Sequence, residues 1–135
     1  MDNNKQESLE EKFQAINNTA DSTNEFNPKD IEQNKVMAVL AYLGILVLVP
    51  IFAAKESKFA RFHANQGLIL CIIGIILYFA VVILMSISMK LAAILSLFLW
   101  LIELGILVLA IIGIINAVKG RAKELPLVGK YRILK

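Results

Sequence analysis

Residues 55–67 read KESKFARFHANQG and separate two long uncharged runs of the chain. The run before them, 36–54, has nineteen residues, and the run after them, 67–89, has twenty-three. Each is long enough to cross a hydrocarbon core of about 30 Å as a helix. The polar stretch is therefore predicted to be a loop at one face of a membrane.

A third apolar run covers residues 91–118 and contains a single charge, Glu103. As one helix its twenty-eight residues would be about 42 Å long, so part of it must tilt or extend beyond the core. The break at Lys90 predicts a tight hairpin with the preceding run. The sequence thus predicts an all-α integral membrane protein with three transmembrane helices at about 36–54, 66–89 and 91–118.

Within the polar stretch, aromatic and basic residues recur at helical spacing over about 56–65. Phe59 and Phe62 would dip into the headgroup boundary while Lys58 and Arg61 meet lipid phosphate. This pattern predicts a short interfacial helix between the first and second spans. Small residues recur at helical spacing in the first two spans, which favours close helix packing: Ala38, Ala41 and Gly44 in the first and Gly67, Cys71 and Gly74 in the second. In the first span the alternative is that they are ordinary small residues of a membrane helix.

The two ends of the chain differ in charge. Residues 1–34 hold eight of the eleven acidic side chains and three of the fourteen basic ones, together with many Asn. They bury too little apolar surface to offset the entropy of ordering, so they are expected to form a disordered acidic tail. Residues 35–118 would form the membrane domain, and residues 119–135 a basic tail on the membrane surface.

Orientation follows from the distribution of Lys and Arg. With three spans, residues 55–67 and the C-terminal tail share one side, which carries nine basic residues against five on the other. The side with more positive charge is expected to be cytoplasmic. The prediction is a multi-pass protein of the cell membrane with its N-terminus outside and its C-terminus in the cytoplasm.

Several side chains are candidate functional groups. Glu103 is an acid inside an apolar run, where it would act in transport or proton coupling, or else reach the interface or pair with another helix. A second candidate is a cytoplasmic motif formed by the loop and the end of the last helix: Arg61, Phe62, His63, Asn65, Gln66, Asn116 and Lys119. Six basic residues are candidates for lipid headgroup contacts: Lys58, Arg61, Arg121, Lys123, Lys130 and Arg132.

Known catalytic patterns are missing from the sequence. It contains one His and one Cys, Cys71, so an internal disulfide or a Cys/His metal cluster is excluded. No Gly-rich phosphate loop or serine elbow occurs. We expect no enzyme activity, no cofactor and no nucleic-acid partner; the expected partners are anionic lipid and a protein partner or a second copy of the chain.

Two motifs carry a family resemblance. FARFHANQGL at 59–68, and NAVKG at 116–120 with the following Pro126-Leu127 and Lys130 to Ile133, resemble small bacterial membrane proteins related to the twenty-kilodalton Tic subunit of the chloroplast inner envelope. This resemblance implies no assigned activity for the bacterial members, and its plastid relatives are similar to channel or scaffold subunits of a protein-import complex. We expect a non-enzymatic membrane scaffold or interaction subunit. The alternative is a subunit of a transport or protein-translocation channel that uses Glu103. The plastid proteins are thought to have four spans, against three here.

Overall fold

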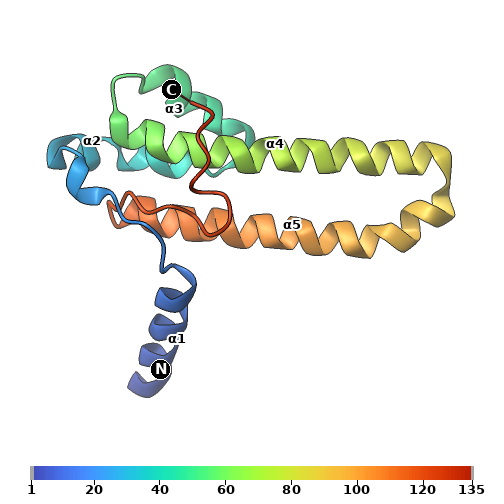
Figure 1. The fold of residues 1–135 in the computed structure, drawn as a ribbon, viewed down its shortest axis with the longest axis horizontal. Helices are drawn as coiled ribbons and strands as arrows, with labels where there is room; N and C mark the ends of the chain where they lie inside the picture. Colours follow the sequence, from blue (N-terminus) through green and yellow to red (C-terminus); the bar gives the residue numbers. More distant parts are fainter. Residues whose placement is uncertain (1, 135) are drawn as a thin grey trace.

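The computed structural model describes residues 2–134; Met1 and Lys135 lie outside the described residues. Its longest feature is an antiparallel hairpin of two helices, α4 (Lys58–Ile87) and α5 (Met89–Val118), which lie side by side in Figure 1. Ser88 is extended at the tip, and its hydroxyl accepts a hydrogen bond from the Leu91 amide at 3.3 Å, which caps α5. Residues 2–134 form no β-strand beyond one isolated bridge between Asp21 and Lys123.

The outer surface of this hairpin is apolar. Large side chains along both helices stand exposed, for example Ile76 at 61%, Ile94 at 74% and Phe98 at 70% of their surface. Contiguous exposed surface of this kind indicates a membrane or a partner, because soluble monomers rarely expose such large apolar patches. Within residues 2–134, α4 and α5 are the two helices long and apolar enough to cross a membrane.

The first apolar run does not form a third such helix. It is divided among the end of α2 (Pro28–Leu40), the 3₁₀ helix η2 (Gly44–Val47) and the short α3 (Leu48–Ala53). Gly44 takes a left-handed backbone, φ 61°, and after it the chain packs back against α2. We call residues 36–54 the reversing unit. The prediction of a third transmembrane helix is wrong because this run turns back, as Figure 1 shows.

A separate interfacial helix at 56–65 is also not found. Those residues lead directly into α4, whose N-terminus is capped by the Ser57 hydroxyl, which accepts from the Ala60 amide at 3.0 Å. Phe59 is fully buried and Phe62 nearly so, and both rings pack edge-on against Phe26 at centroid distances of 6.2 and 5.7 Å. The aromatic side chains that were expected to meet lipid instead fill a protein core.

Most of the molecule's core lies at one end of the hairpin. We call this end the head: it comprises residues 17–70 and 112–134. Its centre includes Phe59, Tyr42, Val47, Ile112 and Leu125, all at most 6% exposed. Helix α2 packs against both α4 and α5, which brings the reversing unit onto the hairpin. The rest of α4 and α5 projects from the head (Figure 1).

The N-terminal region differs from the disordered tail that was expected. It contains α1 (Asn3–Ile16), η1 (Thr23–Glu25) and the start of α2, which Asn27 caps by accepting from the Lys29 amide at 2.9 Å. Helix α1 has no buried residue and points away from the head in Figure 1. Residues 20–22 instead pair with the C-terminal segment: the Ser22 amide donates to the Ala122 carbonyl at 2.9 Å, and the Glu124 amide to the Ala20 carbonyl at 3.0 Å.

This pairing bears on one part of the predicted orientation, the placing of the two termini on opposite sides of a membrane. An N-terminus and a C-terminus on opposite sides of a membrane would keep these two segments apart, whereas here they lie at the same end of the hairpin. The C-terminal segment, too, lies partly inside the protein: Ala122, Lys123 and Leu125 are buried in the head. A tail lying wholly on a membrane surface would leave those side chains without their present contacts. The three domain boundaries drawn from the sequence stay predictions.

Candidate functional site

His63 lies at the centre of the predicted cytoplasmic motif and is completely buried. Its Nε2 is 3.0 Å from the Arg121 carbonyl oxygen, and its Nδ1 is 2.8 Å from the Tyr42 hydroxyl. Because a carbonyl oxygen can only accept, Nε2 carries the proton, and in the neutral ring Nδ1 then accepts from the tyrosine hydroxyl. The geometry therefore fits a neutral imidazole that ties three segments of the head together. Burial raises the pKa of the Tyr42 phenol, which stays a hydrogen-bond donor.

Asn65 and Gln66 hold the C-terminal segment through their side-chain amides. Asn65 donates to the Tyr131 carbonyl at 2.6 Å and accepts from the backbone amides of residues 133 and 134 at 2.5 and 2.9 Å. Gln66 accepts from the Leu125 amide at 2.6 Å and donates to the Lys123 carbonyl at 3.4 Å. The two side chains provide the irregular segment with hydrogen bonds that a neighbouring strand would otherwise supply.

The other members of the motif have different neighbours. Asn116, near the end of α5, pairs with Asn17 through two amide hydrogen bonds of 2.8 and 3.2 Å. The ammonium group of Lys119 lies 5.6 Å from the centre of the Phe13 ring. Phe62 is covered by the Arg132 guanidinium at 5.2 Å, and Arg61 is half-buried. The structure thus brings the loop and both terminal segments into one head, while the functional role of these residues stays a prediction.

The six basic residues proposed for lipid headgroups are not equivalent. Lys58, Arg121 and Lys130 are exposed. Lys123 is 8% exposed and pairs across from Asp21, and Arg132 forms a salt bridge of 3.1 Å with Glu124. Arg61 is half-buried. Contact with lipid phosphate is therefore open mainly to the exposed Lys58, Arg121 and Lys130.

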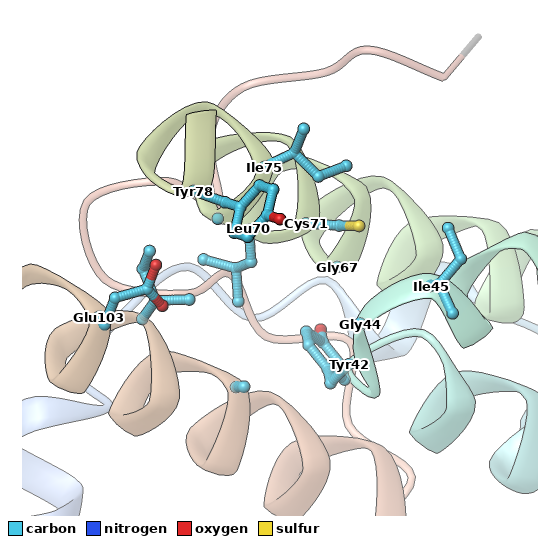
Figure 2. Close-up of a pocket in the computed structure, with 12 residues that line it drawn as sticks. Tyr42, Gly44, Ile45, Gly67, Leu70, Cys71, Ile75, Tyr78 and Glu103 are labelled. Atoms are coloured by element: carbon cyan, nitrogen blue, oxygen red, sulfur yellow. The ribbon is translucent and has the colours of Figure 1, made fainter. Parts of the chain in front are cut away.

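Glu103 stands on α5 at the edge of a groove of about 420 Å³ between the reversing unit and the hairpin. Figure 2 shows Glu103 and Tyr78 at one end of this groove and Gly44 and Ile45 at the other. Among residues 2–134, no hydrogen bond or ion pair involves its carboxylate. The remaining lining is largely apolar, including Leu70, Cys71 and other aliphatic side chains. Nothing in the described residues supports a transport or translocation path.

Three residues that complete the head were missed by the sequence analysis: Asn17, Asp30 and Tyr42. Asp30 connects α2 to α4, because one carboxylate oxygen accepts from the Phe59 amide at 3.0 Å and the other from the Asn34 side chain at 2.9 Å. A carboxylate at a helix N-terminus is favourable for the helix dipole. Asn17 and Asp30 carry no signal in the sequence that separates them from the many other polar residues of the N-terminal region.

Metal-binding groups are not assembled in the part of the chain described. No group of three His, Cys, Asp or Glu side chains there could hold a metal ion. Every buried side-chain nitrogen and oxygen among the described residues has a hydrogen-bond partner. The polar groups of the motif therefore stabilise the head, and none of them points unpaired into a cavity.

Fold and site together define a class of protein: a small, membrane-associated helical hairpin that carries a compact head. Residues 33–133 match the magnetosome magnetite crystal formation protein family, and the chain belongs to this family. It is 32% identical over 96 residues to the magnetosome protein MmsF of Paramagnetospirillum magneticum, an alignment that covers 69% of this chain and 79% of that protein.

Two further relatives are also magnetosome proteins. The magnetosome protein MamF of Paramagnetospirillum magneticum is 33% identical over 96 residues, covering 71% of this chain and 79% of the relative. MamF of Magnetospirillum gryphiswaldense is 31% identical over 93 residues, covering 69% and 77%. No solved structure matches the chain. The resemblance to relatives of the Tic subunit is wrong, since the family and these relatives are magnetosome proteins.

Proposed function

We propose that this protein is a non-enzymatic membrane component of magnetite crystal formation that acts as a scaffold or interaction subunit. The main support for the proposal is that the motif's polar side chains bind the protein's own backbone. His63, Asn65 and Gln66 all bind backbone groups of the C-terminal segment, so they build a rigid head instead of an open reaction site. Membership of the crystal-formation family supplies the process in which the head would act.

On this proposal the α4–α5 hairpin anchors the head to the membrane as a two-span unit. From Gly67 to Ile87, α4 carries no charge, and its twenty-one residues would extend about 31 Å, which matches a hydrocarbon core. Every Lys and Arg except Lys90 comes before residue 62 or after residue 118. The positive-inside rule then favours a cytoplasmic position for the basic residues of the head, with the hairpin tip on the opposite side.

The exposed face of the head, together with helix α1, is the proposed interaction surface. Lys58, Arg121 and Lys130 are exposed and positioned to contact anionic lipid headgroups, each worth on the order of 1 kcal/mol near such a surface. Helix α1 presents Leu9 and Ile16 at 53% and 58% exposure, together with Glu7, Glu10 and Glu11. An exposed apolar and acidic helix of this kind suits a protein partner or a second copy of the chain.

Complementation tests this function. The chain would be expressed in Paramagnetospirillum magneticum cells that lack their own MmsF and MamF, and crystal dimensions would be measured by electron microscopy. We expect a shift of the crystals toward the dimensions seen in unmodified cells. The shift should be lost with Asn65→Ala, which releases the C-terminal segment, and kept with Ser86→Ala, an exposed position near the hairpin tip.

Membrane fractions from the same cells provide the control for expression. If the protein is present in magnetosome membranes and crystals are unchanged in number and size, the proposed function is contradicted.

A further inference from the structure

The reversing unit has an apolar outer face that no part of the described chain covers. Val36, Ile45 and Phe52 are 70%, 65% and 66% exposed, and Leu43, Leu46 and Leu48 are each at least 40% exposed. Residues 36–54 contain no charge, yet Lys35 precedes them and Lys55 follows them. An uncharged segment between two lysines fits a lipid environment, with the ammonium groups at the headgroups.

The position of the unit along the hairpin indicates how deep it would lie. A Cβ added at Gly67 of α4 would be 1.7 Å from the Ala41 carbonyl oxygen, and one added at Gly113 of α5 would be 2.3 Å from the Tyr42 ring. The turn of the unit therefore sits against these two positions. Gly67 is twenty residues, or about 30 Å of helix, from the end of α4. If one edge of the hydrocarbon core lies at the hairpin tip, the other edge therefore lies near the turn of the unit.

The groove beside the turn extends further toward the tip. Gly44 and Ile45 line it together with Gly74 and Tyr78 of α4 and Ile106 of α5. Gly44 and Ile45 lie at the end of this groove nearer the head (Figure 2). The turn is therefore the deepest part of the unit, at the edge of the core, and its insertion is shallow. This places the unit in one leaflet only, because the far half of the hairpin has no such neighbour (Figure 1).

We infer that the reversing unit inserts into the head-side leaflet and makes the protein a wedge that favours a membrane convex toward the head. In that leaflet the bilayer must accommodate the unit in addition to α4 and α5, and in the far leaflet only the two helices of the hairpin. Shallow apolar insertion of this kind is sensitive to curvature. The inference rests on the hairpin anchor of the proposed function, and its partner is the lipid bilayer itself.

The first arm of the test measures insertion. In a Cys71→Ala background, single cysteines are placed at Ile45 and at Asn24, both exposed in the protein. The purified full chain is reconstituted into phosphatidylcholine/phosphatidylglycerol vesicles and treated with a membrane-impermeant maleimide. We expect Asn24→Cys to react in outward-facing molecules and Ile45→Cys to stay protected until detergent is added. Equal labelling of both positions without detergent would overturn the inference.

The second arm measures curvature preference. Outward-facing molecules are labelled at Asn24→Cys with an impermeant dye, and their density per membrane area is compared between small and large vesicles of the same lipid. We expect a higher density on small vesicles. The preference should disappear with Ile45→Ser/Phe52→Ser and remain with Leu97→Ser/Phe98→Ser, which changes two exposed side chains in the far half of α5.

A density that is independent of vesicle size, or a preference that survives Ile45→Ser/Phe52→Ser, would overturn the wedge. Extraction of the vesicles with alkaline carbonate distinguishes loss of the curvature preference from loss of the hairpin anchor. Protein that carbonate extracts from the vesicles would overturn the hairpin anchor and the wedge with it. Protein that resists extraction but shows no preference for small vesicles would overturn the wedge alone.

Discussion

The side-chain amides of Asn17 and Asn116 exchange two hydrogen bonds, although 99 residues separate them in the chain. Asn17 follows α1, Asn116 lies in the last turn of α5, and both side chains are at most 2% exposed. A reciprocal amide pair satisfies a donor and an acceptor on each residue, which matters because buried polar groups without partners are costly. The pair fixes the N-terminal segment to the end of the hairpin from which the C-terminal segment leaves.

Breaking this amide pair should destabilise the head. Asn116→Ala leaves the buried Asn17 amide without its partner, at an expected cost of about 1–3 kcal/mol in the free energy of unfolding. Denaturant unfolding in detergent micelles measures it, with Asn18→Ala, an exposed neighbour, as the matched control. Equal stability of Asn116→Ala and Asn18→Ala would mean that the pair is not formed in solution.

Two glycines of α4 should respond in opposite ways to alanine. At Gly67 a methyl group would lie 1.7 Å from the Ala41 carbonyl oxygen, so α2 must move away, and we expect a loss of at least about 1–3 kcal/mol. At Gly74 nothing lies within 4 Å, and alanine is the better helix former, so stability should be unchanged or up to about 1 kcal/mol higher. Thermal unfolding of the two variants in the same micelles compares them directly, and a similar melting temperature for both would contradict the packing of α2 on α4.

Asn65 should control the release of the C-terminal segment. Asn65→Ala removes three hydrogen bonds to residues 131, 133 and 134, which leaves the chain around Lys130 and Arg132 open to trypsin. We expect faster cleavage after these residues, with little change in the cleavage of α1, which is already exposed. Ser86→Ala is the control. Unchanged cleavage of the C-terminal segment in Asn65→Ala would show that the segment is held by other contacts.

Glu103 should oppose insertion of the hairpin. The carboxylate lies in the middle of the apolar helix α5, without a partner among the described residues. A charged or acidic side chain within a membrane helix is costly. Glu103→Leu is expected to favour membrane insertion by on the order of 1–3 kcal/mol, measured with a glycosylation reporter in microsomes. Leu104→Ile, at an exposed neighbouring position, is the control. An unchanged inserted fraction would mean that water or a partner already stabilises Glu103.

Length and hydropathy were sufficient to predict the two long helices and the tight hairpin, whose break lies at Ser88 instead of Lys90. The same criteria failed for residues 36–54, because a nineteen-residue apolar run can cross a bilayer or fold back inside one leaflet with the same composition. The turn depends on a left-handed Gly44 and on contacts of Ala41 with Gly67, which are separated by 26 residues. A contact at that separation leaves no periodic pattern in a single sequence.

The loop motif was located from its residue types, but its partners were only partly predictable. His63, Asn65 and Gln66 stand out as polar side chains beside an apolar run, and a hairpin necessarily brings them near the C-terminal segment. The expectation that Phe59 and Phe62 face lipid was wrong because Phe26, in the region expected to be disordered, covers both rings. An N-terminal region rich in Asn and acids gave no indication that Asn17 and Asp30 bind elsewhere in the head.

The side of the membrane on which each terminus lies is the most direct test of the two-helix hairpin. Single cysteines at Asn18 and Lys130, both exposed, are introduced in a Cys71→Ala background, and a membrane-impermeant maleimide is applied to right-side-out and inside-out vesicles from the same cells. With a two-helix hairpin and a cytoplasmic head, both positions should react in inside-out vesicles and neither in right-side-out vesicles. Labelling of Asn18→Cys and Lys130→Cys from opposite sides would contradict the two-helix hairpin and restore a three-span chain.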